Sequence, residues 1–291
     1  MDAIPRAPFR VSEYVRAHTV EDAVDALSHF GSRAAIIAGG TNVLVDRPRV
    51  DALIDIRRLG LRHLRDGGGL AIGALATVAD LQSSPLLAGP LRIVADAARA
   101  HGHALLRHLA TIGGNLCKAH PVLDFPPPLL ALDAEVRLRG GGGARALPIA
   151  EFFLDFQRTA LGEDEILTEI AIPAPAPGTG SALLRQGWTR VDLAIASAAV
   201  VLTLAPDGTC CKARIALGTA GPTPMRAREA EAGLEGRPID ESAITRAAAT
   251  AAGEARPMSF FRGSEAYKRH VIRVFVARGL AAAAGRAREA A

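Results

Sequence analysis

Apolar and polar positions along the first half of the chain alternate between helical and extended spacing. Segment 19–31 predicts a helix, because Thr19 can cap its start, acidic residues follow and Gly31 can end it. Thr77 gives a similar start signal before a second apolar stretch. After this helix, the sequence predicts strands at 33–40, 52–59 and 69–75, and helices at 77–87 and 91–103. Helices and strands are therefore interleaved.

Further along, segment 129–140 changes from helical to extended spacing, and the glycines at 140–143 predict a flexible turn between strands. Segment 165–173 alternates like a strand and stops at Pro173, which favours a strand at the edge of a sheet.

The best linker is segment 173–181, where proline and glycine disfavour both helices and strand pairing. It predicts a boundary between one domain at 1–176 and another at 177–291. The second domain is expected to be a small sheet backed by helices, with strands at 182–188, 194–205 and 211–220 and helices at 241–255 and 264–291.

Composition narrows the class of protein. The chain has 291 residues, 49% of them hydrophobic, which is enough for two domains with real cores. Its apolar runs are shorter than the ~20 residues that span a bilayer, and residues 1–10 lack the apolar stretch of a leader, so a cytoplasmic location is expected. Three cysteines without metal-ligand spacing cannot supply an iron-sulfur cluster. The scarcity of aromatic residues argues against nucleic-acid binding.

Two glycine-rich loops are the candidates for chemistry. In the first, at 36–46, Gly39 and Gly40 would let backbone amides approach a pyrophosphate, with Thr41 and Asn42 as side-chain donors. In the second, at 110–116, Gly113 and Gly114 would again expose backbone amides, and Thr111 and Asn115 flank them. Neither loop fits the Rossmann or Walker pattern. One such loop is more often a tight turn, but two with the same rim favour a dinucleotide cofactor.

Other residues have a functional and a structural interpretation. His101, His103, His108 and His120 lie within twenty residues, but no cysteine or carboxylate shares a helical face with them, so no metal site is predicted. Asp124 could cap the proline-led helix that follows it. Lys118 suggests a surface charge or, less readily, a phosphate contact. Trp188 suits either a core position or the shielding of a cofactor.

Several segments in order resemble a known family: AGGTNVLVD, ATIGGNLCKAHPVLDFPPPLLALDAEV, EILTEIAIP and RVDLAIASAAV, with IALGTAGPTPMRAREAEA and SEAYKRHVIRVFVARGL further on. They are similar to the FAD-binding medium subunit of the carbon monoxide dehydrogenase and xanthine dehydrogenase type of molybdenum hydroxylase. The resemblance covers nearly the whole chain. It implies an α+β fold: an FAD-binding domain of the PCMH and vanillyl-alcohol oxidase type with two subdomains, followed by a C-terminal domain with a small antiparallel sheet and helices.

The resemblance also implies a set of FAD contacts. Around the pyrophosphate it places Ile36, Ile37, Ala38, Gly39, Gly40, Thr41, Asn42 and Val43, completed by Thr111, Gly113, Gly114 and Asn115. It implies that Asp124 forms hydrogen bonds with the ribityl or ribose hydroxyls, and that Leu167 contacts the flavin or adenine region through its backbone atoms. Near the flavin ring it places Arg185, where relatives often have lysine, and Asp192, Leu193 and His101, the last at a position that is apolar or aromatic in relatives.

The implied function is electron transfer without a catalytic residue of the chain's own. FAD here would take electrons from two [2Fe-2S] clusters in a small subunit and deliver them to an external acceptor, while substrate reacts at a molybdopterin-type molybdenum cofactor in a large subunit. A dimer of such heterotrimers is expected. Two alternatives stay open: a self-contained flavin oxidoreductase resembling the cell-wall precursor reductase, and a scaffold that has lost its flavin. The sequence names neither the substrate nor the acceptor.

Overall fold

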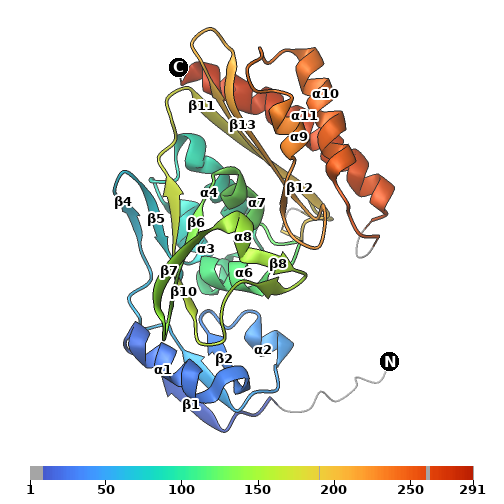
Figure 1. Ribbon diagram of the computed structural model, residues 1–291. Coiled ribbons are helices and arrows are strands. Elements are labelled where there is room, and N and C mark those ends of the chain that lie inside the picture. The colour runs from blue at the N-terminus through green and yellow to red at the C-terminus, as the bar shows by residue number, and fades with distance from the viewer. Residues whose placement is uncertain (1–8, 190, 260–262, 291) are drawn as a thin grey trace.

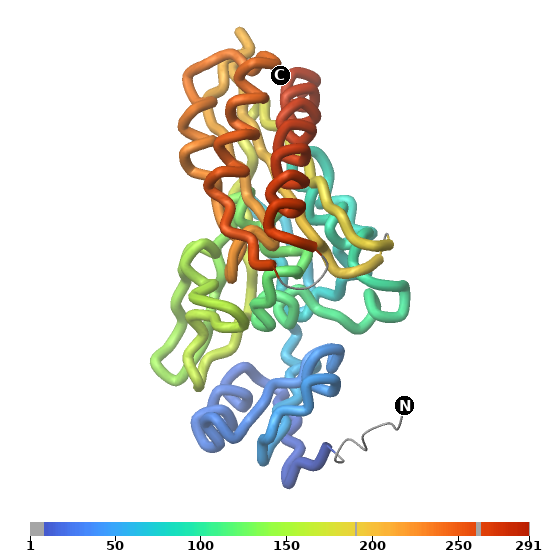
Figure 2. The backbone as a smooth tube through the Cα atoms, turned by 90° about the vertical axis from the view of Figure 1, so that its right-hand side faces the viewer, coloured from blue at the N-terminus to red at the C-terminus, as the bar shows by residue number. Residues whose placement is uncertain are grey.

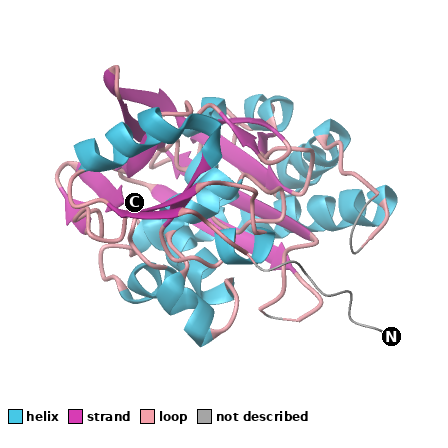
Figure 3. Ribbon diagram, turned by 90° about the horizontal axis from the view of Figure 1, so that it is seen from below, coloured by secondary structure: helices cyan, strands magenta, loops and turns pink. Residues whose placement is uncertain are grey.

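The computed structural model describes residues 9–189, 191–259 and 263–290, and its three parts are stacked along one axis (Figures 1 and 2). Each part has its own sheet: three parallel strands, then five antiparallel strands, then four antiparallel strands. Seen along the axis, helices flank the strands (Figure 3). The expected α+β fold is confirmed, with two subdomains followed by a small antiparallel sheet with helices.

The first part begins as the sequence predicts. Thr19 caps the first helix by accepting a hydrogen bond from the amide of Asp22, whose carboxylate accepts one from the amide of Thr19, and Gly31 ends the helix at φ 53°. The sheet order is β1-β3-β2. The elements of this part are β1 (Glu13–Arg16), α1 (Val20–Phe30), η1 (Gly31–Arg33), β2 (Ala34–Ile37), α2 (Val43–Asp46) and β3 (Ala52–Asp55).

The second part is built on a sheet of order β4-β5-β10-β6-β7, with the short pair β8-β9 beside it. The glycines at 140–143 form the turn between β6 and β7, as predicted. The strands are β4 (Leu64–Asp66), β5 (Gly69–Gly73), β6 (Glu135–Gly140), β7 (Gly143–Pro148), β8 (Phe153–Asp155), β9 (Arg158–Thr159) and β10 (Ile166–Pro173). The helices are α3 (Val78–Ser83), η2 (Gly89–Leu91), α4 (Arg92–Ala100), α5 (Ala104–Leu109), α6 (Ile112–Lys118), α7 (Pro126–Ala131) and α8 (Ile149–Phe152).

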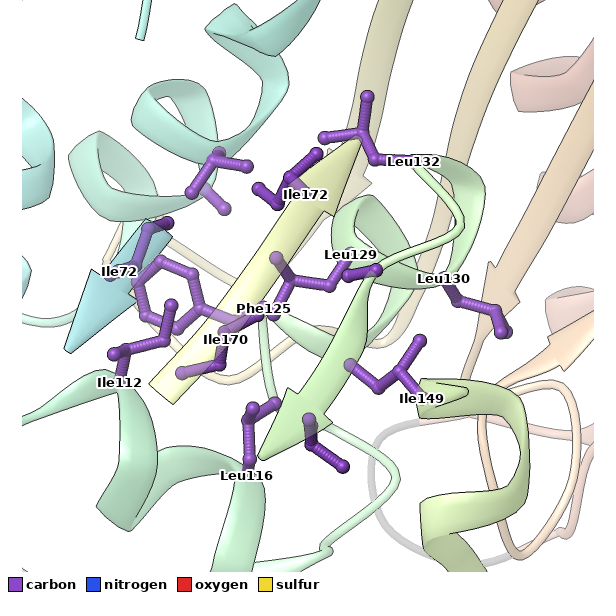
Figure 4. Close-up of a cluster of buried hydrophobic side chains, with 14 of the residues drawn as sticks. Ile72, Ile112, Leu116, Phe125, Leu129, Leu130, Leu132, Ile149, Ile170 and Ile172 are labelled. Carbon is purple, nitrogen blue, oxygen red and sulfur yellow. The ribbon is translucent and has the colours of Figure 1, made fainter. Parts of the chain in front are cut away.

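The core of this part lies between the sheet and its helices. Phe125, before α7, packs with Ile112 and Leu116 of α6 and with Ile170 of β10 (Figure 4). All four side chains are almost completely buried. This core holds α6 and the start of α7 against β10, and so fixes the segment 119–125 that runs between these two helices.

The prediction that segment 165–173 forms an edge strand was wrong. β10 is the central strand, paired with β5 on one side and β6 on the other. Pro173 is its last residue, where a missing amide interrupts no further pairing. The alternation of apolar residues reports which face is buried, but not whether a strand has one neighbour or two.

The sheet of the third part is covered on both faces. Along β12, Ala198 and Val200 face α11, whereas Ala199 and Val201 join the core of the second part. This explains the continuous apolar run at 194–205, because neither face meets water. The elements are β11 (Thr179–Gln186), β12 (Ala196–Leu204), β13 (Cys210–Gly218), β14 (Met225–Arg226), α9 (Arg228–Ala232), α10 (Glu241–Glu254) and α11 (Glu265–Glu289).

The described part of the chain contains no helix that is both long and apolar enough to cross a bilayer. Residues 1–8, most of the segment in which no leader was predicted, lie outside the described residues. The predicted linker 173–181 is confirmed only in part: Pro173 ends β10 and residues 179–181 begin β11, so that only the segment 174–178 contains no helix or strand.

Asp80 carries a pH-dependent part of the stability of α3. Its carboxylate accepts from the Thr77 amide at 2.9 Å and from Arg62 at 2.8 and 2.9 Å, and the Arg62 hydrogen bonds above all lower its pKa to about 2. A lowered pKa stabilises the fold above pH ~4, and this contribution is lost as the pH falls through about 2. We expect Asp80→Asn to cost about 1 kcal/mol at pH 7 and roughly a third of that at pH 2.5, measured by urea unfolding. The exposed Asp25, replaced by Asn, is the control; an equal loss at both pH values would contradict the expectation.

Candidate functional site

Both glycine-rich loops line one cavity of about 420 Å³. The first joins β2 to α2 through residues 38–42, and the second begins at Ala110 and Thr111 after α5 and continues into the first turn of α6 at residues 112–115. The loops touch at Gly39, where an added Cβ would lie 1.8 Å from the backbone oxygen of Leu109. Since segments about 70 residues apart in sequence meet without room for a methyl group, the contact requires glycine at this position.

The first loop presents unpaired backbone donors. Among the described residues, the amides of residues 39–42 donate to no protein acceptor, and the Asn42 side chain makes no capping hydrogen bond to α2. Gly40 has φ 71°, a conformation that side chains rarely adopt. A run of such amides in a glycine turn is a site for an anion such as a phosphate, as the sequence predicts for this loop.

The second loop differs from its prediction. The amide of Gly113 donates to Ala74 O at 2.9 Å, and that of Gly114 donates to the Thr111 hydroxyl at 3.2 Å, so both amides are used within the protein. Gly113 is needed because a Cβ there would lie 2.7 Å from Ala74 O. The polar group left over is Oδ1 of Asn115, which is buried without a partner although the residue lines the cavity. Such an atom is expected to bind a ligand group or water.

A lysine and an aspartate pair across the cavity wall. Lys118 at the end of α6 donates to Asp46 of α2 at 2.7 Å, and both residues line the cavity. The side chain of Lys118 is 22% exposed and lies at the wall of the cavity, which is compatible with both interpretations of this residue, a surface charge and a phosphate contact. The pair gives the cavity one positive and one negative group beside the first loop.

Three charged or polar side chains join the two domains behind the cavity. His101 Nδ1 lies 2.9 Å from Asp124 Oδ2, and Arg185 Nε of β11 donates to Asp124 Oδ1 at 2.6 Å. Asp124 makes no capping hydrogen bond to α7, which begins without a side-chain cap. None of the histidines belongs to a metal-binding group: the described residues contain no cluster of three His, Cys, Asp or Glu side chains suited to a metal.

Comparisons with known proteins identify the two domains. Residues 8–175 match the family described as the FAD binding domain in molybdopterin dehydrogenase, and residues 188–283 match the CO dehydrogenase flavoprotein C-terminal domain. The chain belongs to this FAD-binding family. The motifs that resemble the medium subunit of molybdenum hydroxylases are thereby confirmed as family features.

Two curated relatives match this FAD-binding subunit over almost their whole length. The 6-hydroxypseudooxynicotine dehydrogenase complex subunit alpha of Paenarthrobacter nicotinovorans is 35% identical, with 95% of each chain covered. The carbon monoxide dehydrogenase medium chain of Hydrogenophaga pseudoflava is also 35% identical, with 93% of this chain and 96% of the relative covered. Both are named as parts of dehydrogenases, so this chain is an oxidoreductase subunit.

Solved structures of related enzymes superpose closely on this chain. A carbon monoxide dehydrogenase chain from Hydrogenophaga pseudoflava superposes with a TM-score of 0.91 at 36% identity, covering 95% of this chain and 98% of that one. Quinoline 2-oxidoreductase from Pseudomonas putida 86 gives 0.89 at 26% identity, covering 97% and 100%. The fold of the FAD-binding subunit therefore matches that of the medium chain from end to end.

Most of the residues predicted for the cofactor lie around the one cavity. They are Ile36, Ala38, Gly39, Gly40, Thr41, Asn42, Val43, His101, Thr111, Gly113, Gly114, Asn115, Leu167 and Leu193. Four others do not line it. The side chain of Ile37 is buried on the opposite side of β2 from Ile36, as strand alternation requires. Asp124 and Arg185 pair behind the wall, and Arg185 also donates to the backbone oxygen of Asp192.

Sequence reasoning missed a second group of lining residues: Asp46, Pro48, Ile56, Ala74, Leu75, Leu106, Ala110, Cys117, Leu123, Leu161 and Ile166. Most are apolar and lie next to a predicted residue, either in sequence or across a strand. An apolar side chain carries no sequence signal for a cofactor site, so these residues could be assigned to the cavity only from the structure. Trp188, for which the sequence left both a core position and the shielding of a cofactor open, is 69% exposed and does not line this cavity.

Proposed function

We propose that FAD occupies the cavity between the two glycine loops. The observation that carries the proposal is the meeting of unpaired amides at 39–42 with the unpartnered Asn115 oxygen in one cavity of a chain from an FAD-binding family. The amides suit the pyrophosphate, and Asn115 suits a hydroxyl or ring N–H. Apolar neighbours such as Leu75, Leu106 and Ile166 suit the rings, and the volume lies within the roughly 300–1,000 Å³ of ligand sites.

From this site we infer an electron-transfer role. When bound, FAD supplies the redox chemistry, and the chain binds it, orients it and sets its electrostatic surroundings. Relatives belong to dehydrogenases, one of them a carbon monoxide dehydrogenase that was solved in a form lacking the Mo-pyranopterin moiety of its molybdenum cofactor. We propose that this subunit likewise works with a large molybdenum-cofactor subunit and a small subunit with two [2Fe-2S] clusters. Electrons from that small subunit would pass through this chain to an external acceptor, in a dimer of heterotrimers.

Exposed leucines and a valine at the rim of the cavity support a partner at this face. Leu44 and Val45 of α2 are 49% and 64% exposed, and Leu105 and Leu109 of α5 are 75% and 56% exposed. α2 and α5 are brought together by the contact between Gly39 and Leu109. Apolar side chains gathered on a surface favour protein association, and this one adjoins the cavity from which electrons would pass.

We further propose a domain boundary near residue 176 and a cytoplasmic location. The family matches end at 175 and begin again at 188. The three cysteines, Cys117, Cys210 and Cys211, are free thiols, which is usual in a reducing compartment.

An absorption spectrum tests the proposed function. The purified chain, incubated with FAD and desalted, is expected to keep the absorbance of an oxidised flavin, and the co-expressed complex is expected to add iron-sulfur and molybdenum signals. Flavin in a chain that assembles with no partner and reduces a substrate by itself would favour the self-contained oxidoreductase. The absence of flavin from both preparations would favour the alternative of a scaffold that has lost its flavin.

The ion pair in the wall gives a specific prediction. In Lys118→Met, the Asp46 carboxylate would face the pyrophosphate without its cation, and we expect the Kd for FAD to rise roughly tenfold, equivalent to about 1.4 kcal/mol. Asp46→Asn is expected to leave the Kd equal or lower, because it removes a negative charge. Fluorescence titration measures both. Lys212→Met, on β13 outside the cavity, is the matched control, and an unchanged Kd in Lys118→Met would argue against phosphate binding beside α6.

A further inference from the structure

The cluster behind the cavity has an unusual property: its carboxylate has no free oxygen. Asp124 uses Oδ1 for Arg185 and Oδ2 for His101, at 2.6 and 2.9 Å. The side chains of Asp124, Arg185 and His101 are 4%, 9% and 11% exposed. A buried carboxylate held from both sides is costly to rearrange, so Asp124 is poorly placed to turn towards a ligand in the cavity.

His101 is the member of the cluster that lines the cavity. It ends α4, while Asp124 precedes α7 and Arg185 belongs to β11 of the C-terminal domain. Nδ1 of the ring is taken by Asp124, and among the described residues no hydrogen bond engages Nε2. Because Arg185 already balances the charge of Asp124, a neutral ring that donates from Nδ1–H satisfies the carboxylate. The lone pair of such a ring is then on Nε2.

We propose that His101 binds FAD directly through Nε2, which accepts a hydrogen bond from a hydroxyl or N–H of the cofactor, and that Asp124 and Arg185 are positioning residues that act through it. This rests on the proposed function, because it assumes that FAD occupies the cavity. It gives the C-terminal domain a part in cofactor binding: β11, which carries Arg185, orients a side chain of the other domain. The same logic operates where a carboxylate fixes the tautomer of a functional histidine.

Two substitutions at one position separate the two nitrogens. The amide of Asn reaches the place of Nδ1 but not of Nε2, whereas the amide of Gln reaches the place of Nε2. We expect His101→Asn to keep the pairing with Asp124 and the unfolding temperature, but to raise the Kd for FAD about tenfold. His101→Gln is expected to keep most of the affinity. His108→Ala, an exposed histidine on α5 outside the cavity, is the control and should match the wild type.

The positioning role is tested by coupling. Arg185→Met is expected to raise the Kd about fivefold when residue 101 is His, and much less when it is Gln, because Gln no longer depends on Asp124. Arg185→Lys should restore most of the affinity. An equal effect of Arg185→Met in both backgrounds, or wild-type affinity in His101→Asn, would overturn the proposal.

These outcomes are distinct from failure of the proposed function. If the wild-type chain binds no FAD, the cavity assignment itself falls. If the wild type binds FAD and the four variants above bind it equally well, only the role of His101 and its positioning pair falls.

Discussion

The protein with Gly39 replaced by alanine is expected to purify folded but without flavin. A Cβ at this position would lie 1.8 Å from the backbone oxygen of Leu109 and 2.6 Å from its carbonyl carbon. Both atoms belong to the backbone next to the second loop, which cannot rotate away as a side chain could. The two loops must therefore separate, which would widen the cavity where the unpaired amides lie.

The expected loss is at least about 100-fold in FAD affinity, corresponding to roughly 3 kcal/mol. It would be measured as the flavin retained after saturation and desalting, together with a titration of the apoprotein. Gly142→Ala is the matched control, because this glycine lies in an exposed turn where a Cβ meets no atom within 4 Å. Circular dichroism would check that the variant has folded. Full flavin content in folded Gly39→Ala would show that the loops need not touch for binding.

Gly40→Ala gives the comparison within the same loop. Its added Cβ would meet Leu44 Cδ1 at 3.2 Å, and this exposed side chain can move. The strain of φ 71° remains, worth about 1–2 kcal/mol. We therefore expect a smaller loss of flavin than in Gly39→Ala. The order of the two variants distinguishes contact between the loops from backbone strain.

The sequence predicts local features of this fold well where a single residue type decides them. Thr19 and Thr77 both cap helices, and the glycines at 140–143 turn one strand into the next. The central place of β10 could not be predicted, because its partners β5 and β6 come from distant parts of the chain. Helices as short as α5 and α6, of six and seven residues, have too few turns to show a clear period.

The candidate site also has some features that the sequence predicts and others that it does not. The two glycine pairs could be found because a doubled glycine is a strong local signal. What each glycine does could not, because the role of Gly113 depends on Ala74, and that of Gly39 on Leu109. The partners of Asp124 were equally hidden: Arg185 is 61 residues away and belongs to another domain. A local pattern identifies a loop, whereas the use of its amides depends on what packs against it.

The second large effect is expected where the domains meet. Arg226 of β14 is buried, with a side chain only 6% exposed, and donates to Glu231 at 3.0 Å, to Asp133 at 2.7 Å and to Leu130 O at 3.3 Å. Asp133 and Leu130 lie at the end of α7 in the first domain. Burial by itself would lower the pKa of Arg226, but Glu231 and Asp133 outweigh it and raise the pKa, so the cation is retained.

Removing this cation leaves two carboxylates behind. Glu231 is 4% exposed and also accepts from the Ile215 amide, so it cannot move into water without breaking β13 from α9. We expect Arg226→Met to lower the free energy of unfolding by about 3–5 kcal/mol. Arg246→Met, in which the lost partner is the exposed Ser242, is expected to cost no more than about 0.5 kcal/mol. Urea unfolding at pH 7 measures both.

A double variant separates the loss of the ion pair between Arg226 and Glu231 from the cost of leaving the Glu231 carboxylate buried without its cation. In Arg226→Met with Glu231→Gln, the amide oxygen of Gln can still accept from the Ile215 amide, and no buried anion remains at 231. Asp133 is 36% exposed and keeps Arg214 and Lys212 as partners. The double variant is therefore expected to be more stable than Arg226→Met alone. If it were less stable by the full cost of Glu231→Gln, the two residues would act independently, and the buried charge would not be what joins the domains.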